Sequence, residues 1–351
     1  MKKSIYYKFL LLILIVTSGV AKANDAEGNG HDVGFSVGPN FALTDLGGAK
    51  KIGSPFLRDV DFKATRFCIS AFYRYNVNRF FAVRANLMYG MLSADDKNTD
   101  GTPPGPNGPT PSWYRARRNL NFTTHIFEFQ VLGEINLKKY VHDAGNGSSD
   151  RWAPYVGVGA GFFWFNPYTK VDDAKVSLRS LGTEGQLLNG GKPYKNVQFD
   201  LMALVGIKYN ITERISIALE GVYHQTFTDY LDDVSGNYVN PTDLNELTPM
   251  ARILQNRSGT GNYPSDQYNF VEGQKDSRPT LSDGFTPNPN YGQLFTNTDA
   301  KGNKRGDKTD NDQFFNIQVT VSFSLPTGGK AGFGSCGRRN PYHHKFACPK
   351  W

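Results

Sequence analysis

The sequence predicts an all-β fold, an eight-stranded antiparallel up-and-down transmembrane β-barrel with long extracellular loops and a periplasmic C-terminal tail. Apolar and polar residues alternate in eight segments of roughly ten residues, which is typical of strands that cross an outer membrane. Long and short connections alternate between these segments, as in barrels with large loops outside and brief turns inside. Beyond residue 23, no stretch reaches the roughly 18 apolar residues of a spanning helix, so any membrane span must be a strand.

Residues 1–23 have the pattern of a secretory signal peptide. Lys2 and Lys3 precede an apolar run over 9–16, and Ala21-Lys22-Ala23 has the small residues of a cleavage site. Removal of this segment takes away four lysines, so the formal net charge falls from +7 to +3. The basic balance therefore indicates an export signal and not a nucleic-acid-binding surface. We expect the barrel to occupy 24–325 and the tail to occupy 326–351.

The clearest hairpin joins the segments 197–209 and 215–226. In the first, Val197, Phe199 and Leu201 alternate with polar residues, and the second continues the same period of two. Only four residues separate the two segments, which predicts a tight turn between antiparallel strands.

The other strands follow from the same alternation. The predicted strands, in order, are 33–41, 66–75, 81–90, 127–137, 155–164, 197–209, 215–226 and 315–325. Runs rich in Pro, Gly, Asn and Asp cannot hold strands and are expected to be loops; they are 42–65, 94–118, 167–196 and 228–312. Residues 76–79 form a short turn, and 138–152 form a polar connection.

On this register the inward face carries charges of both signs. Because a barrel of about eight strands has room inside only for side chains, we expect these charges to be paired and the interior to be packed, which argues against an open porin. Cys68 also faces the lumen and is expected to be a small buried filler. The inward charged residues are Arg66, Arg74, Arg84, Glu128, Glu134, Asp200, Lys208 and Glu220.

No pattern predicts a catalytic, cofactor-binding or metal site, so we expect no enzyme. His125 and His224 lie in or beside strands, but their spacing gives no Ser/His/acid arrangement, although a barrel can assemble such a site across strands. Gly157, Gly159 and Gly161 lie inside a strand and do not open a helix, so they do not form a phosphate-binding loop. The close glycines instead suit a crowded lumen or a strongly bent strand.

Three further features near the strand ends have simple interpretations. Asp229, Asp232 and Asp233 could supply oxygen ligands for Ca²⁺, but they lack EF-hand spacing, so a solvated acidic rim is preferred. The tripeptide at 305–307, Arg-Gly-Asp, lies in a polar loop and is assigned no role. Aromatic residues are expected to form girdles at the two membrane interfaces; they are Tyr89, Trp152, Tyr155, Trp164 and Tyr223.

Several short segments resemble one known family. They are 226–235 (TFTDYLDDVS), 238–241 (YVNP), 72–76 (FYRYN), 181–186 (LGTEGQ) and the C-terminal CPKW at 348–351. In these the chain resembles the PorG family, the outer-membrane barrel component of the type IX secretion system. The resemblance implies a non-enzymatic role that anchors a periplasmic ring, built from proteins of the PorK and PorN type, to the outer membrane. The loop over 240–312 looks longer than is usual in that family.

The predicted tail is basic, aromatic and free of acidic residues. Its glycines favour a flexible segment that orders on contact with an acidic partner surface. The alternative to partner binding is an unstructured basic tail that binds lipid phosphates or nothing. The residues expected to contact a partner are Cys336, Arg338, Arg339, Tyr342, Phe346, Cys348 and Trp351.

The three cysteines are too few for a disulfide scaffold. Cys336 and Cys348 could close a small loop with each other, or one of them could bridge to a ring protein. A zinc site from these two with His343 and His344 is less favoured, because adjacent histidines lack a standard spacing. The competing interpretation of the whole chain is a surface barrel whose extracellular loops bind ligands or host tissue.

Overall fold

The computed structural model describes residues 30–325 apart from 48–61, 100–117, 139–150, 213, 240–242, 256 and 258–304. The predicted signal peptide and the predicted tail both lie outside the described residues. Within them, no helix is long and apolar enough to cross a membrane.

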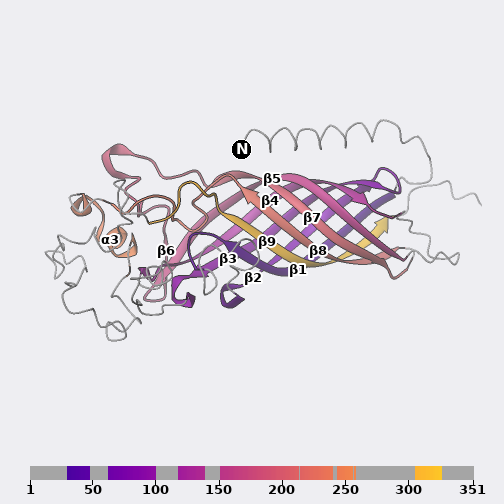
Figure 1. The fold of residues 1–351 in the computed structure, drawn as a ribbon, viewed down its shortest axis with the longest axis horizontal. Coiled ribbons are helices and arrows are strands. Elements are labelled where there is room, and N and C mark those ends of the chain that lie inside the picture. The colour runs from indigo at the N-terminus through magenta and orange to yellow at the C-terminus, as the bar shows by residue number, and fades with distance from the viewer. Residues whose placement is uncertain are drawn as a thin grey trace, which may run out of the picture.

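The described chain forms a closed antiparallel barrel (Figure 1). Its sheet runs in the order β4-β3-β2-β1-β9-β8-β7-β5, and pairing between β4 and β5 closes it. A short strand, β6, pairs only with the end of β5. The strands are β1 (Gly30–Leu43), β2 (Arg66–Asn76), β3 (Phe81–Asp95), β4 (Asn121–Asn136), β5 (Trp152–Val171), β6 (Ala174–Ser177), β7 (Val197–Asn210), β8 (Ile215–Thr226) and β9 (Gln313–Leu325).

All eight predicted barrel strands are confirmed, and three of them extend at one end by five or more residues beyond the predicted bounds. β3 runs on to Asp95, β4 begins at Asn121 and β5 reaches Val171. β6 lies inside a segment that we expected to be loop. Asp172 and Asp173, which join β5 to β6, both have positive φ (47° and 64°), the backbone required by a two-residue hairpin turn.

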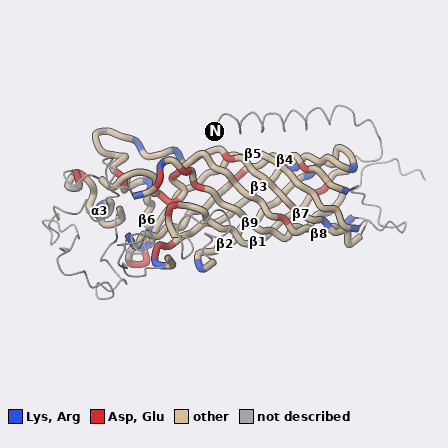
Figure 2. Tube along the Cα trace, in the orientation of Figure 1, with Lys and Arg blue, Asp and Glu red and all other residues tan. Residues whose placement is uncertain are grey.

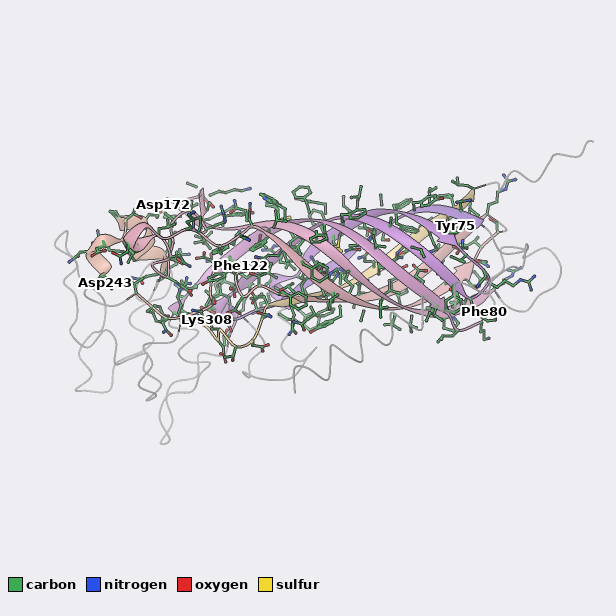
Figure 3. All side chains as sticks on the ribbon, turned by 90° about the horizontal axis from the view of Figure 1, so that it is seen from above. Tyr75, Phe80, Phe122, Asp172, Asp243 and Lys308 are labelled. Carbon is green, nitrogen blue, oxygen red and sulfur yellow. The ribbon has the colours of Figure 1, made fainter. Side chains whose placement is uncertain are left out.

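The inward and outward faces alternate as predicted. In β2 the outward side chains of Phe67 and Ile69 are 48% and 46% exposed, whereas Cys68 and Arg74 on the inward face are 0% and 1% exposed. Figure 3 shows side chains projecting from the outer wall along the whole barrel. An outward apolar band around a polar interior is the arrangement of a barrel that crosses a lipid bilayer.

The two ends of the barrel differ (Figure 1). One end, which we call the turn end, carries the short β2–β3 and β7–β8 turns. The first residue of β1 and the last residue of β9 also lie there. At the other, the loop end, lie β6 and the helix α3 (Pro249–Gln255). At the loop end, acidic residues gather where the strands pass into the connecting segments (Figure 2). Which end faces the periplasm stays a prediction.

Candidate functional site: the barrel interior and its cap

An ion-pair network fills the lumen near the turn end. The carboxylate of Glu134 lies 2.8 Å from Lys208 Nζ and 3.1 Å from Arg74 Nε. It also lies 3.2 Å from Arg84 Nε, and Arg84 pairs at 2.8 Å with Glu220. The five side chains come from β2, β3, β4, β7 and β8, so the network joins opposite walls of the barrel.

The charges of this network are balanced. Asp32 of β1 completes it 3.6 Å from Arg74, which gives three carboxylates and three cations. Tyr155 donates a hydrogen bond to Glu220, and Lys208 Nζ lies 3.9 Å from the centre of its ring. Because a buried charge without a partner costs several kcal/mol, the balance is what makes this interior tolerable.

The position of Tyr155 corrects one prediction. We expected it in a membrane-interface girdle, but its side chain is fully buried inside the barrel. In β5 it lies on the inward face with Gly157, because side chains of a strand alternate between its two faces. Trp152 and Trp164, on the outward face of the same strand, are exposed as the girdle prediction requires.

Amide side chains occupy the lumen on the loop-end side of the ion pairs. Asn86 donates to Gln130 at 2.6 Å, and Gln318 donates to Asn316 at 2.6 Å. All four are at most 5% exposed. Buried amides that bond to each other are typical of a filled interior.

An apolar cluster closes the loop end of the lumen. It joins inward side chains of the strands to side chains from the connections, so the two form one core. We call the connecting segments the cap; they are 44–47, 178–196, 227–239, 243–255 and 305–312. From the strands come Leu92, Phe122, Ile126, Phe163, Phe165 and Phe314, and from the cap come Leu46, Leu178, Leu231, Val234 and Leu254.

The acidic segment after β8 is inside the cap, which overturns the predicted solvated rim. Asp232 and Asp233 are 1% and 0% exposed, and Asp229 is 7% exposed. Asp232 accepts hydrogen bonds from the backbone N–H groups of Leu46 at 2.9 Å and Val234 at 2.8 Å. Backbone donors thus stabilise the Asp232 carboxylate, which sequence spacing alone suggested was hydrated.

Two buried arginines hold the cap together. Arg305 pairs with Glu184 at 3.0 Å, and its Nε donates to the backbone carbonyl of Gln255 at 3.1 Å. Arg118, beside β4, pairs with Asp96 at 2.7 Å and joins the barrel to the cap, because its Nη2 donates to the backbone carbonyl of Asp45 at 3.0 Å. The tripeptide to which we assigned no role therefore begins with a structural residue, and Arg305 is only 4% exposed.

The pKa values of three carboxyl groups in the acidic segment after β8 are raised. Burial, reinforced by the nearby Asp45 carboxylate, raises the pKa of Asp229 to about 9 and the pKa of Asp232 to about 7. Burial raises the pKa of Asp233 to about 6, with the Arg305 guanidinium opposing the increase. The cap therefore takes up protons near neutral pH.

The family model described as "Outer membrane protein beta-barrel domain" matches residues 9–245. The chain belongs to this family. No curated protein matches the chain.

Several solved outer-membrane barrels are similar to this member of the family. Neisserial surface protein A is 7% identical, with 84% of this chain and 97% of that chain covered and a TM-score of 0.34. Ail of Yersinia pestis, solved with the heparin analogue sucrose octasulfate, is 8% identical, with 85% and 99% covered and a TM-score of 0.32. OprG of Pseudomonas aeruginosa is 9% identical, with 86% and 100% covered and a TM-score of 0.30.

The structure brings together some predicted residues and leaves others outside the described residues. The partner-binding residues expected between Cys336 and Trp351 all lie outside them. Cys68 lies in the lumen as predicted and is fully buried. Sequence reasoning missed one group: in the described chain, the possible metal ligands Glu128, Asp200 and His224 lie within 4.8 Å of one another. They are far apart in sequence, so only the cross-strand register reveals them.

Proposed function

We propose that this chain is the outer-membrane barrel of a type IX protein secretion system and that it anchors a periplasmic ring of the PorK and PorN type. The role is non-enzymatic. In this arrangement the loop end faces the outside of the cell, and both mature termini lie in the periplasm.

The filled lumen is the observation that carries the proposal. Charge-balanced ion pairs, amide pairs and an apolar cluster fill the described interior in succession from the turn end to the cap. An eight-stranded barrel so packed has no room for a solute path. A protein of this kind acts through its surfaces and its connecting segments, as a scaffold does.

The resemblance supplies the identity of the partner. The segment 226–235, where the chain resembles the PorG family most closely, supplies Leu231 and Val234 to the apolar cluster and buried aspartates to the cap. Long loops on the outer side and short turns on the periplasmic side are the rule for inserted barrels. The strand β9 ends with Leu325 at the turn end, so a tail that follows it begins on the side where a periplasmic ring would lie.

Deletion of 327–351 tests the proposal. We expect the barrel to insert, as judged by its heat-dependent mobility on a denaturing gel, while ring proteins no longer co-purify and secretion of type IX cargo stops. Deletion of 258–303, a loop segment of greater length, is the matched control and should leave both intact. Normal secretion and normal co-purification without the tail would refute the scaffold role.

Two other outcomes identify the alternatives. Loss of surface binding after the loop deletion, with secretion unaffected by either deletion, would indicate an adhesin. For the cysteines, a high-mass band on a non-reducing gel that collapses with reductant and disappears in a Cys336→Ser, Cys348→Ser variant would indicate a bridge to a ring protein. A monomer under both conditions would contradict that bridge.

A further inference from the structure

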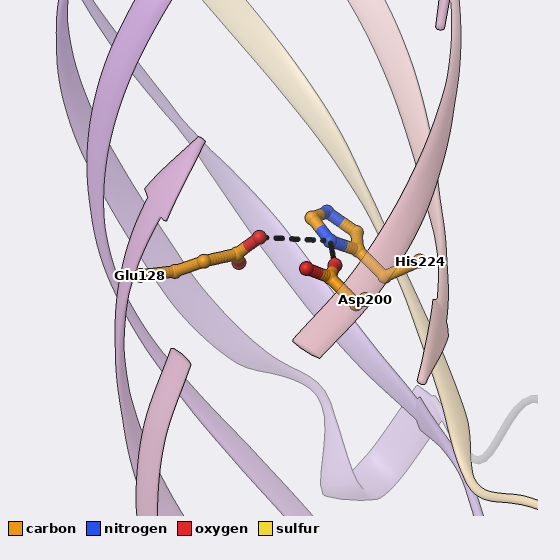
Figure 4. Close-up of side chains that lie close together, drawn as sticks. All are labelled: Glu128, Asp200 and His224. Carbon is orange, nitrogen blue, oxygen red and sulfur yellow. Dashed lines mark hydrogen bonds and ion pairs between the residues drawn. The ribbon is translucent and has the colours of Figure 1, made fainter. Parts of the chain in front are cut away.

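A second cluster of buried titratable side chains lies in the lumen nearer the loop end, apart from the balanced network. Glu128 of β4, Asp200 of β7 and His224 of β8 converge there (Figure 4). His224 Nδ1 lies 2.8 Å from Asp200 Oδ2 and 3.5 Å from Glu128 Oε1. The exposed fraction of all three side chains is 0%.

This cluster has more carboxylate oxygens than donors. Among the described residues, both oxygens of Glu128 and Oδ1 of Asp200 make no hydrogen bond, apart from the 3.5 Å ion pair of Glu128 with His224. A single N–H at Nδ1 cannot satisfy two carboxylates. Buried carboxylate oxygens without donors are costly, so their presence points to a ligand that they bind.

The charge of the cluster is also unbalanced. No lysine or arginine of the described chain pairs with Glu128 or Asp200, in contrast to the three cations around Glu134. Two carboxylates and one imidazolium leave one net negative charge in the lumen. A divalent cation with a neutral imidazole would bring the sum to zero.

β5, which pairs with both β4 and β7, has a glycine at the position between the two carboxylates. Gly161 of β5 lies opposite Asp200 in the β5–β7 ladder. A Cβ atom at this position would lie 2.7 Å from Asp200 Oδ1 and 2.7 Å from Glu128 Oε1. These are two of the oxygens that lack donors, so the glycine keeps open the space between them.

The imidazole is held in a fixed orientation. Its ring stacks on Phe314 with centroids 4.0 Å apart, and Nε2 lies 3.1 Å from the side-chain amide of Asn316. If Nδ1 binds a metal ion, Nε2 carries the proton and donates a hydrogen bond to the amide oxygen of Asn316 after the amides of Asn316 and Gln318 both reverse. Asn316 then donates to Gln318, and Gln318 donates to the Ser70 hydroxyl. A polar partner on the second ring nitrogen is the usual support of a metal-binding histidine.

We propose that Glu128, Asp200 and His224 form a binding site for a divalent first-row transition-metal ion of the zinc or manganese type. Two carboxylates and one imidazole suit such ions, whereas Ca²⁺ and Mg²⁺ prefer oxygen ligands alone. The ion would tie β4 to β7 and β8 across the lumen. Its role is structural, and it is independent of the proposed secretion function.

Zinc retention by the refolded chain tests the site. The mature chain is unfolded in urea, refolded into detergent with Zn²⁺ and desalted, and its zinc is measured by mass spectrometry. We expect about one zinc per chain, and in Glu128→Gln and Gly161→Ala a retention reduced at least about tenfold. His125→Gln is the matched control, because His125 lies on the same strand but bonds Tyr89 at 2.8 Å and belongs to no such cluster.

Folding of each variant is checked by heat-dependent gel mobility. If a variant does not fold, X-ray absorption of the zinc in the wild-type chain decides, with nitrogen and oxygen ligands at roughly 2.0–2.2 Å expected. Wild-type chain without zinc after loading would overturn the proposal. Equal zinc in the wild type and in both folded variants, or sulfur in the coordination shell, would also overturn it.

Discussion

Substitution of Glu134 by Gln tests whether the lumen depends on charge balance. The change keeps the size of the side chain but removes the one carboxylate that meets Arg74, Arg84 and Lys208 at 2.8 to 3.2 Å. It also turns an amide N–H₂ toward cations. Because loss of one partner from a buried ion pair costs about 3–5 kcal/mol, the folded-to-unfolded ratio should fall by more than about 100-fold.

The assay is equilibrium unfolding in urea with the barrel in lipid vesicles, followed by gel mobility and tryptophan fluorescence. Lys97→Gln is the control, since Lys97 is 61% exposed in its ion pair with Asp95 and its loss should cost at most about 1 kcal/mol. In Glu134→Gln combined with Lys208→Met, one charge of each sign is gone, so part of the stability should return. A Glu134→Gln barrel as stable as the Lys97→Gln barrel, or a double variant no better than the single one, would refute the reasoning.

The remaining predictions concern the cap and the lipid-facing wall. The folded pKa of Asp229, about 9, exceeds the usual carboxyl value, so its contribution to stability is present below about pH 4 and is lost as pH rises to 9. Cap amides, corrected for intrinsic exchange, should therefore exchange hydrogen faster at pH 9 than at pH 5, and equal protection would contradict this. Arg305→Ala should cost the cap about 3–5 kcal/mol and speed its proteolysis, whereas exposed Lys308→Ala should not; equal cleavage rates would disprove the strut role. Leu219→Arg on the outward face should cost about 2–4 kcal/mol in vesicles and Phe323→Arg near the turn end about 0–1, and the reverse order would mean that the lipid-facing band is misplaced.

The barrel was predictable because the alternation that marks each strand involves only residues close together in the sequence. A strand that separates lipid from a polar lumen must alternate, and a slip of one residue would turn every side chain to the wrong face. The alternation of Val197, Phe199 and Leu201 with polar residues therefore predicts, from the sequence alone, that these three side chains face outward. The inward charges followed from the same register. The cost of burying them predicted the ion pairs among Arg74, Arg84, Glu134, Lys208 and Glu220, whereas Glu128 and Asp200 have no Lys or Arg partner among the described residues.

The cap and the lumen contacts were less predictable. Asp232 and Asp233 look hydrated in sequence, because nothing nearby in the chain indicates the backbone N–H of Leu46, 186 residues away, or the Tyr194 hydroxyl. Tyr155 looked like a girdle residue because it is an aromatic residue near the end of a predicted strand. In each case the deciding neighbour comes from another segment.

The sequence by itself determined the class of fold, the eight barrel strands and the alternation of their inward and outward faces. Only the tertiary structure decided which charges meet, that the aspartates after β8 are buried within the cap, and that Glu128, Asp200 and His224 converge beside Gly161. The alternation of apolar and polar residues is a property of a single strand. A contact across the lumen depends instead on the relative register and stagger of strands that are distant in the chain.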